Sequence, residues 1–350
     1  MADNVFTGAY DRMPWHKKGY IAGRAMTAKE ALEFSQLEYN VIADDLFCGD
    51  GTVINGYKVT RRGDNKSILG VVSDRYKIIQ NIDAFQTIDR IVGTGLASIN
   101  SAFCLGKGEK ICISCEVPSV KSDDGDPLKG FIVVTNSHDG KSACSWIATL
   151  VRVVCENTLN MAFKNFEVED DDKVGYHKIK IRHSGDITAK LFNAEEFMKS
   201  VIEGLDYDKK CLNNLKSSTI TDDEFKRMVL ELIPPPSNAK KIADVPTRTQ
   251  NAWSSVMWHW HRGRGMNNPI SKNTAYGAVN AIAEYADWAK GTRKTDGKDE
   301  FSAKTESILW GSSFQLKQKG AELVQEYVMH KKQNTEVPKK SLVEDILGIN

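Results

Sequence analysis

The spacing of apolar residues changes near residue 184, and this change constrains the fold more than any other feature of the chain. From Tyr39 to about His183 the apolar residues mostly form short runs that are rich in β-branched and aromatic side chains and separated by Gly, Asp and Asn. Beyond Ser184 they recur at the spacing of amphipathic helices. The pattern predicts an α+β fold, in which a mainly antiparallel β-sheet body with packed helices is followed by a helical C-terminal part.

This pattern divides the chain into an N-terminal arm and helix at 1–38, an α+β body at 39–235 and a helical region at 236–350. Strands are expected at VINGYKVTRR, SILGVVS, RYKIIQ, ASINSAFCL, KICISCEVP, GFIVVTN, SACSWIATLVRVV and HKIKIRH. Helices are expected at TAKEALEFSQL, IDAFQTIDRIV, the segment beginning ENTLNMAF, NAEEFMKSVIEGL, TDDEFKRMVLELI, NAWSSVMWHW, NTAYGAVNAIAEYADWAK and SFQLKQKGAELVQEYVMHKK. Capping boxes are expected at Thr27 with Glu30 and at Thr221 with Glu224.

Composition indicates an ordinary globular protein, with 41% hydrophobic and 27% charged residues. No apolar run is long enough to span a membrane, and the first residues lack the apolar core of a signal peptide, so the sequence predicts a cytoplasmic protein. The seven cysteines agree with a reducing compartment. Cys112 and Cys115 form a CxxC motif, but strand alternation sends them to opposite faces, so no metal site is expected.

His138 and Asp139 stand side by side between two predicted strands, in the segment TNSHDGKSACSW. Asp139-Gly140 is a strong hairpin signal, because such a turn needs residues that tolerate positive φ. A hydrolase that uses His138 and Asp139 stays open as an alternative, since triad geometry is invisible in one sequence.

Other enzyme signatures are missing from the sequence. It contains no GxxxxGK[ST], GxSxG or HExxH motif, and its acidic clusters lack the spaced pairing of two-metal nucleases. These observations favour a binding protein over an enzyme, without a cofactor.

The segment YHKIKIRHSG is the best candidate for a nucleic-acid contact. With alternating side chains, Lys178, Lys180 and Arg182 share one face of a strand, with charges about 6.6 Å apart. Such a row can follow a phosphate backbone. The plain alternative is a solvated outer face of an antiparallel sheet.

A weaker copy of this pattern occurs in GYKVTRR, where Lys58, Thr60 and Arg62 share a face. If the two strands are neighbours, they form one basic platform. Arg152 is a single cation in an apolar strand, so it must find an internal carboxylate, a backbone carbonyl or a ligand phosphate.

The segment NAWSSVMWHWHRGRGM combines a core stripe with exposed cations. Trp253, Met257 and Trp260 fall on one helix face and are expected in the core. Arg262 and Arg264, separated by glycines, would be mobile and could bind a phosphate or stack on a base. In the N-terminal PWHKKGY, Trp15, Lys17 and Lys18 form either a small binding arm or a clasp that fixes the terminus.

Six segments in a fixed order resemble the phage and plasmid proteins of the family called domain of unknown function 932. They are PWHKKGY, SILGVVSDRYKIIQN, TNSHDGKSA, VRVVCENTLNMA, IRHSG and NTAYGAVNAIAEY. The resemblance covers nearly the whole chain and implies residence on a mobile element in a bacterial host. More distantly, the chain is similar to the annealing proteins of the RecT and Red-beta type. That similarity implies a curved sheet with a packed helix, a groove for single-stranded DNA, and assembly into rings or filaments.

Together, the residues and the resemblance predict a single-stranded nucleic-acid binder that assists annealing or recombination and forms a homo-oligomer, with DNA favoured over RNA as the ligand. Host or phage recombination proteins are possible partners, and a membrane is not. A host-interaction or anti-defence protein without catalysis is the alternative. The expected nucleic-acid contacts are Lys178, Lys180, Arg182, Lys58, Arg62, Lys141, His138, Arg152, Arg262 and Arg264.

Overall fold

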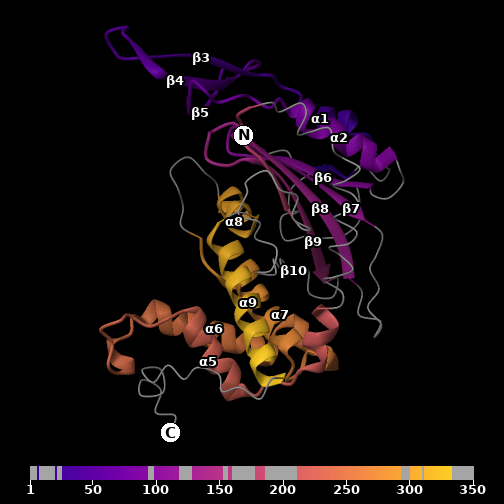
Figure 1. The fold of residues 1–350 in the computed structure, drawn as a ribbon, viewed down its shortest axis with the longest axis vertical. Coiled ribbons are helices and arrows are strands. Elements are labelled where there is room, and N and C mark those ends of the chain that lie inside the picture. Colours follow the sequence, from indigo (N-terminus) through magenta and orange to yellow (C-terminus); the bar gives the residue numbers. More distant parts are fainter. Residues whose placement is uncertain are drawn as a thin grey trace.

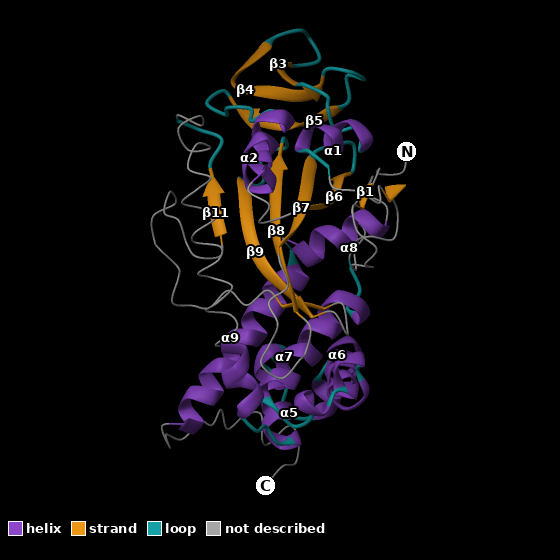
Figure 2. Ribbon diagram, turned by 90° about the vertical axis from the view of Figure 1, so that its right-hand side faces the viewer, coloured by secondary structure: helices purple, strands orange, loops and turns teal. Residues whose placement is uncertain are grey.

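The fold of the chain is given by a computed structural model (Figure 1). The structure describes residues 6–7, 20–21, 26–93, 98–117, 128–152, 157–159, 178–185, 211–292, 300–309 and 311–332. A three-stranded sheet lies at one end of the long axis, a larger sheet in the middle and a group of helices at the other end (Figures 1 and 2). The protein is therefore α+β, as predicted, with the helices concentrated in the C-terminal half.

The larger sheet has eight strands, in the order β10-β9-β8-β7-β6-β1-β2, with β11 also paired to β9. The strands are β1 (Phe6–Thr7), β2 (Tyr20–Ile21), β6 (Ser98–Leu105), β7 (Lys110–Val117), β8 (Leu128–Ser137), β9 (Cys144–Arg152), β10 (Asn157–Leu159) and β11 (Lys178–Ile181). All neighbours are antiparallel except β1 and β2. Strands β6 to β9 run as a curved meander, which brings the β8–β9 hairpin to the end of the sheet nearest the three-stranded sheet (Figure 2).

The centre of this sheet is buried on both faces, which explains its near-continuous apolar sequence. In β7 (KICISCEV) every residue except Glu116 is buried. Two helices, α1 (Ala28–Phe34) and α2 (Asn81–Gly93), lie over one face (Figures 1 and 2). The capping box that was predicted at Thr27 and Glu30 is present at the start of α1.

The three-stranded sheet consists of β3 (Val41–Phe47), β4 (Val53–Arg62) and β5 (Ile68–Ser73), in that order. A register shift between Thr60 and Arg61 marks a bulge in the β4–β5 pairing. Val41 in β3, Thr60 in β4 and Val72 in β5 are buried, whereas their strand neighbours Ile42 and Val71 are exposed. One face of this sheet therefore packs on the protein and the other faces solvent.

The helical part contains α5 (Asp222–Leu232), α6 (Thr247–Arg262), α7 (Ala275–Glu284), a π-helical turn at Tyr285–Ala289, α8 (Glu300–Leu309) and α9 (Ser312–Lys332). Short 3-10 turns lie at Ile242–Asp244, Arg264–Asn267 and Pro269–Ser271. Helix α5 begins with the second predicted capping box, and the α6 residues Trp253 and Trp260 are buried as expected. No helix in the described ranges is long and apolar enough to cross a membrane.

Two local predictions were wrong. RYKIIQ begins in a turn and continues as an irregular link rather than a strand, and the side chain of Gln80 bonds both backbone groups of Val41 in place of a neighbouring strand. In the described part of the helix expected to begin at ENTLNMAF, Asn157–Leu159 instead pair with β9 as strand β10, and the residues that follow lie outside the described ranges. The helix expected at NAEEFMKSVIEGL and the N-terminal Trp15, Lys17 and Lys18 lie outside the described residues.

Candidate functional site

The predicted hairpin at His138 and Asp139 is present between β8 and β9. Thr135 pairs with Ser145, and the loop between the strands includes Gly140, whose φ is +73°. A glycine is favoured there because this conformation is strained for other residues. The loop divides into two halves with different environments: His138 and Asp139 are buried, whereas Gly140 and Lys141 are exposed.

The buried half of the loop packs against β5. A Cβ atom placed on Gly70 would lie 2.6 Å from the Cα atom of Asp139, so only a glycine permits this close approach. In addition, the Thr60 hydroxyl donates to the carbonyl of His138 over 2.6 Å. The three-stranded sheet therefore covers this half of the loop. The expectation that His138 is presented to a ligand was wrong.

His138 acts as a structural histidine in this arrangement. Its side chain has no exposed surface, and its Nε2 lies 2.8 Å from the Oδ1 of Asn81. The Asn81 amide donates to the carbonyl of Leu37, so Oδ1 is an acceptor and the histidine Nε2 carries the hydrogen. Burial lowers the pKa of His138 to about 3, which keeps the ring neutral.

The pair of His138 and Asp139 does not form a catalytic dyad. The Asp139 carboxylate accepts from the Ser137 hydroxyl over 2.5 Å and from the Lys141 N–H over 2.9 Å, while His138 bonds to Asn81. Each side chain thus uses its hydrogen bonds to stabilise the loop. The structure gives no support to a hydrolase built on these two residues.

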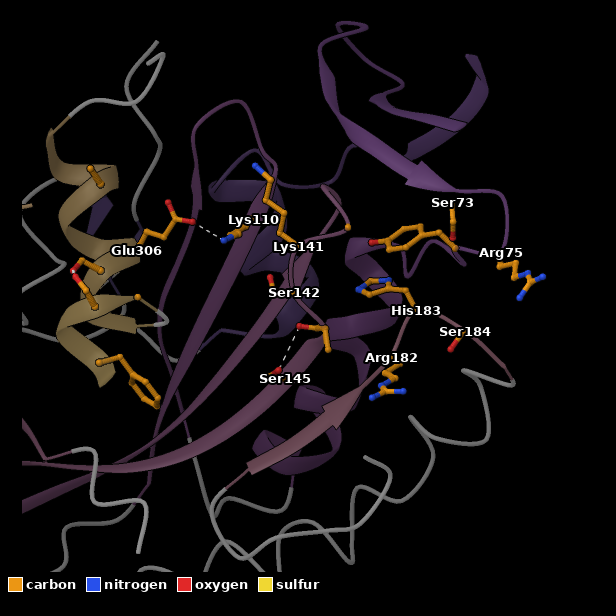
Figure 3. A pocket seen from close by; sticks show the side chains of 18 of the residues that line it. Ser73, Arg75, Lys110, Lys141, Ser142, Ser145, Arg182, His183, Ser184 and Glu306 are labelled. Atoms are coloured by element: carbon orange, nitrogen blue, oxygen red, sulfur yellow. Dashed lines mark hydrogen bonds and ion pairs between the residues drawn. The ribbon is translucent and has the colours of Figure 1, made fainter. Parts of the chain in front are cut away.

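The exposed half of the loop opens into a cleft of about 840 Å³ between the end of the large sheet and helices α8 and α9 (Figure 3). Its walls come from the end of β5, the start of β7, the hairpin loop, the end of β11 and the α8–α9 turn. The lining residues are Ser73, Arg75, Tyr76, Lys110, Gly140, Lys141, Ser142, Ala143, Ser145, Arg182, His183, Ser184, Thr292, Ala303, Glu306, Ser307, Gly311, Ser312 and Phe314.

Cations dominate the charges of this cleft. Arg75, Lys141 and Arg182 are exposed, and Figure 3 shows their side chains around it. The fourth cation, Lys110, is almost buried and forms an ion pair of 2.5 Å with Glu306, the one carboxylate among the described lining residues. The wall therefore carries a net positive charge and attracts anions.

The helical wall adds hydroxyl groups. Ser307 and Ser312 line the cleft at the turn where α9 begins. The Lys290 ammonium donates to the Ser312 hydroxyl over 2.6 Å, and the Ser307 hydroxyl lies 2.9 Å from that of Ser313. Hydroxyl groups of this kind are common partners of phosphate oxygens.

Tyr76 and His183 form an aromatic pair in the opposite wall. Their rings stack with centroids 4.5 Å apart and an interplanar angle of 13°. His183 Nδ1 donates to the carbonyl of Lys77 over 3.0 Å, and burial lowers the pKa of this histidine, so it is neutral near pH 7. The Tyr76 hydroxyl donates to the carbonyl of Ser137 over 2.6 Å. The pair is thus fixed in position beside Arg182.

Strand β11 ends at the cleft. Arg182 lies in the lining, and Lys180 pairs in register with Ser145, which also lines the cleft. For Lys178, Lys180 and Arg152 the structure gives the backbone, and their side chains lie outside the described part.

Lys58 and Arg62 do not join this surface. Strand β4 belongs to the three-stranded sheet and β11 to the large one, so the single basic platform expected for neighbouring strands does not form. The Lys58 ammonium pairs with Asp45 over 2.6 Å. Arg62 bonds both carboxylate oxygens of Asp64 and stacks on Tyr39. Both cations have acidic partners that the sequence alone did not assign to them.

Arg262 and Arg264 are exposed, but they are far from mobile. Gly263 is followed by a 3-10 turn, and the N–H groups of Arg264 and Gly265 donate to the buried carboxylate of Glu284. The Arg264 guanidinium also lies 5.0 Å from the ring of Trp288. The expectation of a mobile arginine segment was wrong, because Glu284 holds its backbone. Neither arginine lines the cleft.

The described residues offer no site for a metal ion, since they contain no group of three or more His, Cys, Asp or Glu side chains in a suitable arrangement. Cys112 and Cys115 are both fully buried, and burial raises the pKa of each thiol, that of Cys115 to about 12. They are core thiols that cannot readily ionise to bind zinc.

Sequence reasoning missed four important residues of the cleft: Arg75, Tyr76, Lys110 and His183. The segments that carry the family resemblance contain three of these residues. SILGVVSDRYKIIQN contains Arg75 and Tyr76, IRHSG contains His183, and TNSHDGKSA contains the hairpin loop. Three of the six segments on which the family resemblance rests therefore meet at one cleft.

Three comparisons with known proteins give one match. A family model described as "Domain of unknown function (DUF932)" matches residues 68–309. That span contains the cleft lining except for Gly311, Ser312 and Phe314 at the start of α9. No curated protein matches the chain, and no solved structure matches it. Because the model covers more than half of the chain, the protein belongs to the family defined by domain of unknown function 932.

Proposed function

We propose that the protein binds single-stranded nucleic acid, with DNA as the first candidate, by holding the sugar-phosphate backbone in the cleft between the large sheet and helices α8 and α9. The observation that carries this proposal is the composition of the cleft. Of the described residues, four cationic side chains and seven Ser or Thr residues line it, against a single carboxylate. Lys, Arg and hydroxyl side chains are the usual partners of phosphate oxygens.

The shape of the cleft supports a single strand over a duplex. Its volume of about 840 Å³ is that of a small-ligand pocket. A short piece of an extended single strand can enter such a hollow, whereas a duplex is too wide and would need a protruding helix or ribbon to read it. The stacked rings of Tyr76 and His183 add a flat wall beside the cations, and aromatic residues next to a basic groove are typical of sequence-tolerant single-strand binders.

The biological setting that we propose follows from the family resemblance. Proteins of this kind on phages and plasmids would act on single strands during annealing or recombination, in the bacterial cytoplasm. RNA is recognised by the same phosphate chemistry, so an RNA oligonucleotide of identical sequence belongs in the same test.

Replacing Lys141 by glutamine is expected to weaken binding of a labelled single-stranded oligonucleotide by about tenfold for every sequence tested, because one exposed phosphate partner is removed. Fluorescence anisotropy at low salt measures this change. Lys29→Gln is the matched control, since Lys29 is an exposed lysine on α1 that pairs with Glu33 and does not line the cleft. Equal affinities of the Lys141→Gln and Lys29→Gln variants would remove the cleft from the proposal.

A further inference from the structure

The solvent-facing side of the three-stranded sheet is unusually apolar. Among the described residues, eleven large hydrophobic side chains are exposed, and six of them lie in this sheet. They are Ile42, Phe47, Val53, Tyr57, Ile68 and Val71, with exposed fractions from 39% to 61%. Scattered exposed apolar residues are normal in a soluble protein, but a contiguous group marks an interaction surface.

The strand register shows that most of these residues form one continuous face. Residues directly opposite each other in an antiparallel pair point to the same side. Across the three strands, Ile42 pairs with Arg61 and Arg61 with Ile68, while Asp44 pairs with Val59 and Val59 with Val71. Tyr57 extends the same face along β4, two residues before Val59. We call Ile42, Asp44, Tyr57, Val59, Arg61, Ile68 and Val71 the outer face.

The charges of the outer face favour a partner of balanced charge. Its two charged residues, Asp44 and Arg61, form an ion pair with each other and are surrounded by apolar side chains. A nucleic acid would gain little binding free energy on this face, because the face lacks the excess of cations that the cleft carries. A second copy of the chain matches the outer face better than a nucleic acid does. When one copy is turned by 180° onto the other, Arg61 can meet Asp44 of that copy, and apolar residues meet apolar residues.

The position of this sheet also permits such contact. It stands at one end of the long axis, opposite the helical part, in both views of the molecule (Figures 1 and 2). Two copies can therefore join through their outer faces while their larger sheets and helices point away from each other. Two sheets packed face to face in this way form a sandwich with an apolar centre.

We propose that the outer face is the interface of a homodimer with two-fold symmetry. Because Tyr57 pairs in register with Ser73, which lines the cleft, the dimer places a cleft next to the interface in each copy. The proposal concerns self-association and holds whether or not the cleft binds nucleic acid.

Light scattering on the full chain tests this interface. The wild type is expected to have the mass of two chains at micromolar concentration. The Ile68→Lys/Val71→Lys variant is expected to have the mass of one, with association weakened at least about thirtyfold, since two charges enter the apolar centre. Both side chains are exposed in the monomer, so the thermal unfolding midpoint of the separated chain should not fall. Met329→Lys, an equally exposed apolar residue on α9, should leave the dimer intact.

The two-fold arrangement has its own test. Arg61→Asp puts two acidic residues on the outer face, and Asp44→Arg puts two basic ones there, so each variant alone should be a monomer. A mixture of the two should form a heterodimer by native mass spectrometry, because the faces are now complementary. A monomeric wild type, a dimer that survives Ile68→Lys/Val71→Lys, or a mixture that stays monomeric would each overturn the proposal.

Discussion

Replacing Asp287 by alanine is expected to lower the free energy of unfolding by about 3–5 kcal/mol. The Asp287 carboxylate lies in the π-helical turn after α7, and the Lys317 ammonium on α9 contacts it over 2.7 Å. Their side chains are 0% and 2% exposed. Without the carboxylate, Lys317 would be a buried charge without its ionic partner, and burial already lowers the pKa of this lysine.

Two further variants distinguish the effect of burying this pair on stability from the effect of losing any ion pair. Lys317→Met combined with Asp287→Leu removes both charges and is expected to regain most of the lost stability. Asp45→Ala removes the exposed partner of Lys58, and this change should cost less than about 1 kcal/mol. Urea titrations measure the change in the free energy of unfolding for all three variants. If Asp287→Ala costs no more than Asp45→Ala, the buried pair does not hold α9 against α7.

A second large effect is expected when pH falls, and it comes from His138. The pKa of this histidine in the folded chain is about 3, against an ordinary value of 6.5. The neutral buried ring therefore contributes stability that is fully present above pH 6.5 and is lost as pH falls toward 3. At pH 4.5 the loss amounts to about 3 kcal/mol, because two pH units separate this pH from the ordinary pKa.

His138→Gln isolates this contribution. The Gln amide can donate to Asn81 as the ring does, but it does not titrate. The difference in unfolding free energy between the variant and the wild type should shift by about 3 kcal/mol in favour of the variant between pH 7.5 and pH 4.5. Chemical denaturation at several pH values measures it. Parallel stability curves for the two proteins would show that His138 is not buried in its neutral form.

The sequence predicted well those features that depend on neighbouring residues. Both capping boxes form because the Thr and Glu side chains lie within one helical turn of each other. The β8–β9 hairpin forms where Gly140 permits positive φ, and Trp253 and Trp260 are buried because helical spacing puts them on one face. Each of these features is encoded within a few residues of the chain.

The features that the sequence did not reveal depend on residues far apart. His138 is buried because β5, some seventy residues earlier, passes over the loop at Gly70. Lys110 meets Glu306 across 196 residues, and nothing local connects them. Lys58 gains its acidic partner Asp45 only when β3 pairs with β4. Arg62 is an exception, because its partner Asp64 is only two residues away in the chain. The cleft is assembled from such distant pieces, which is why only Lys141 and Arg182 among its cations were expected.

The dependence of single-strand affinity on salt tests the central claim most directly. We expect wild-type protein to bind a single-stranded oligonucleotide more tightly than the matching duplex, with an affinity that falls steeply as salt rises. The combined variant Arg75→Gln/Lys141→Gln/Arg182→Gln should bind more weakly, and its slope of log affinity against log salt should be shallower by about 2, or 0.7 for each lost phosphate contact. No binding by the wild type at low salt, or an unchanged slope in the variant, would contradict the assignment of the cleft to nucleic acid.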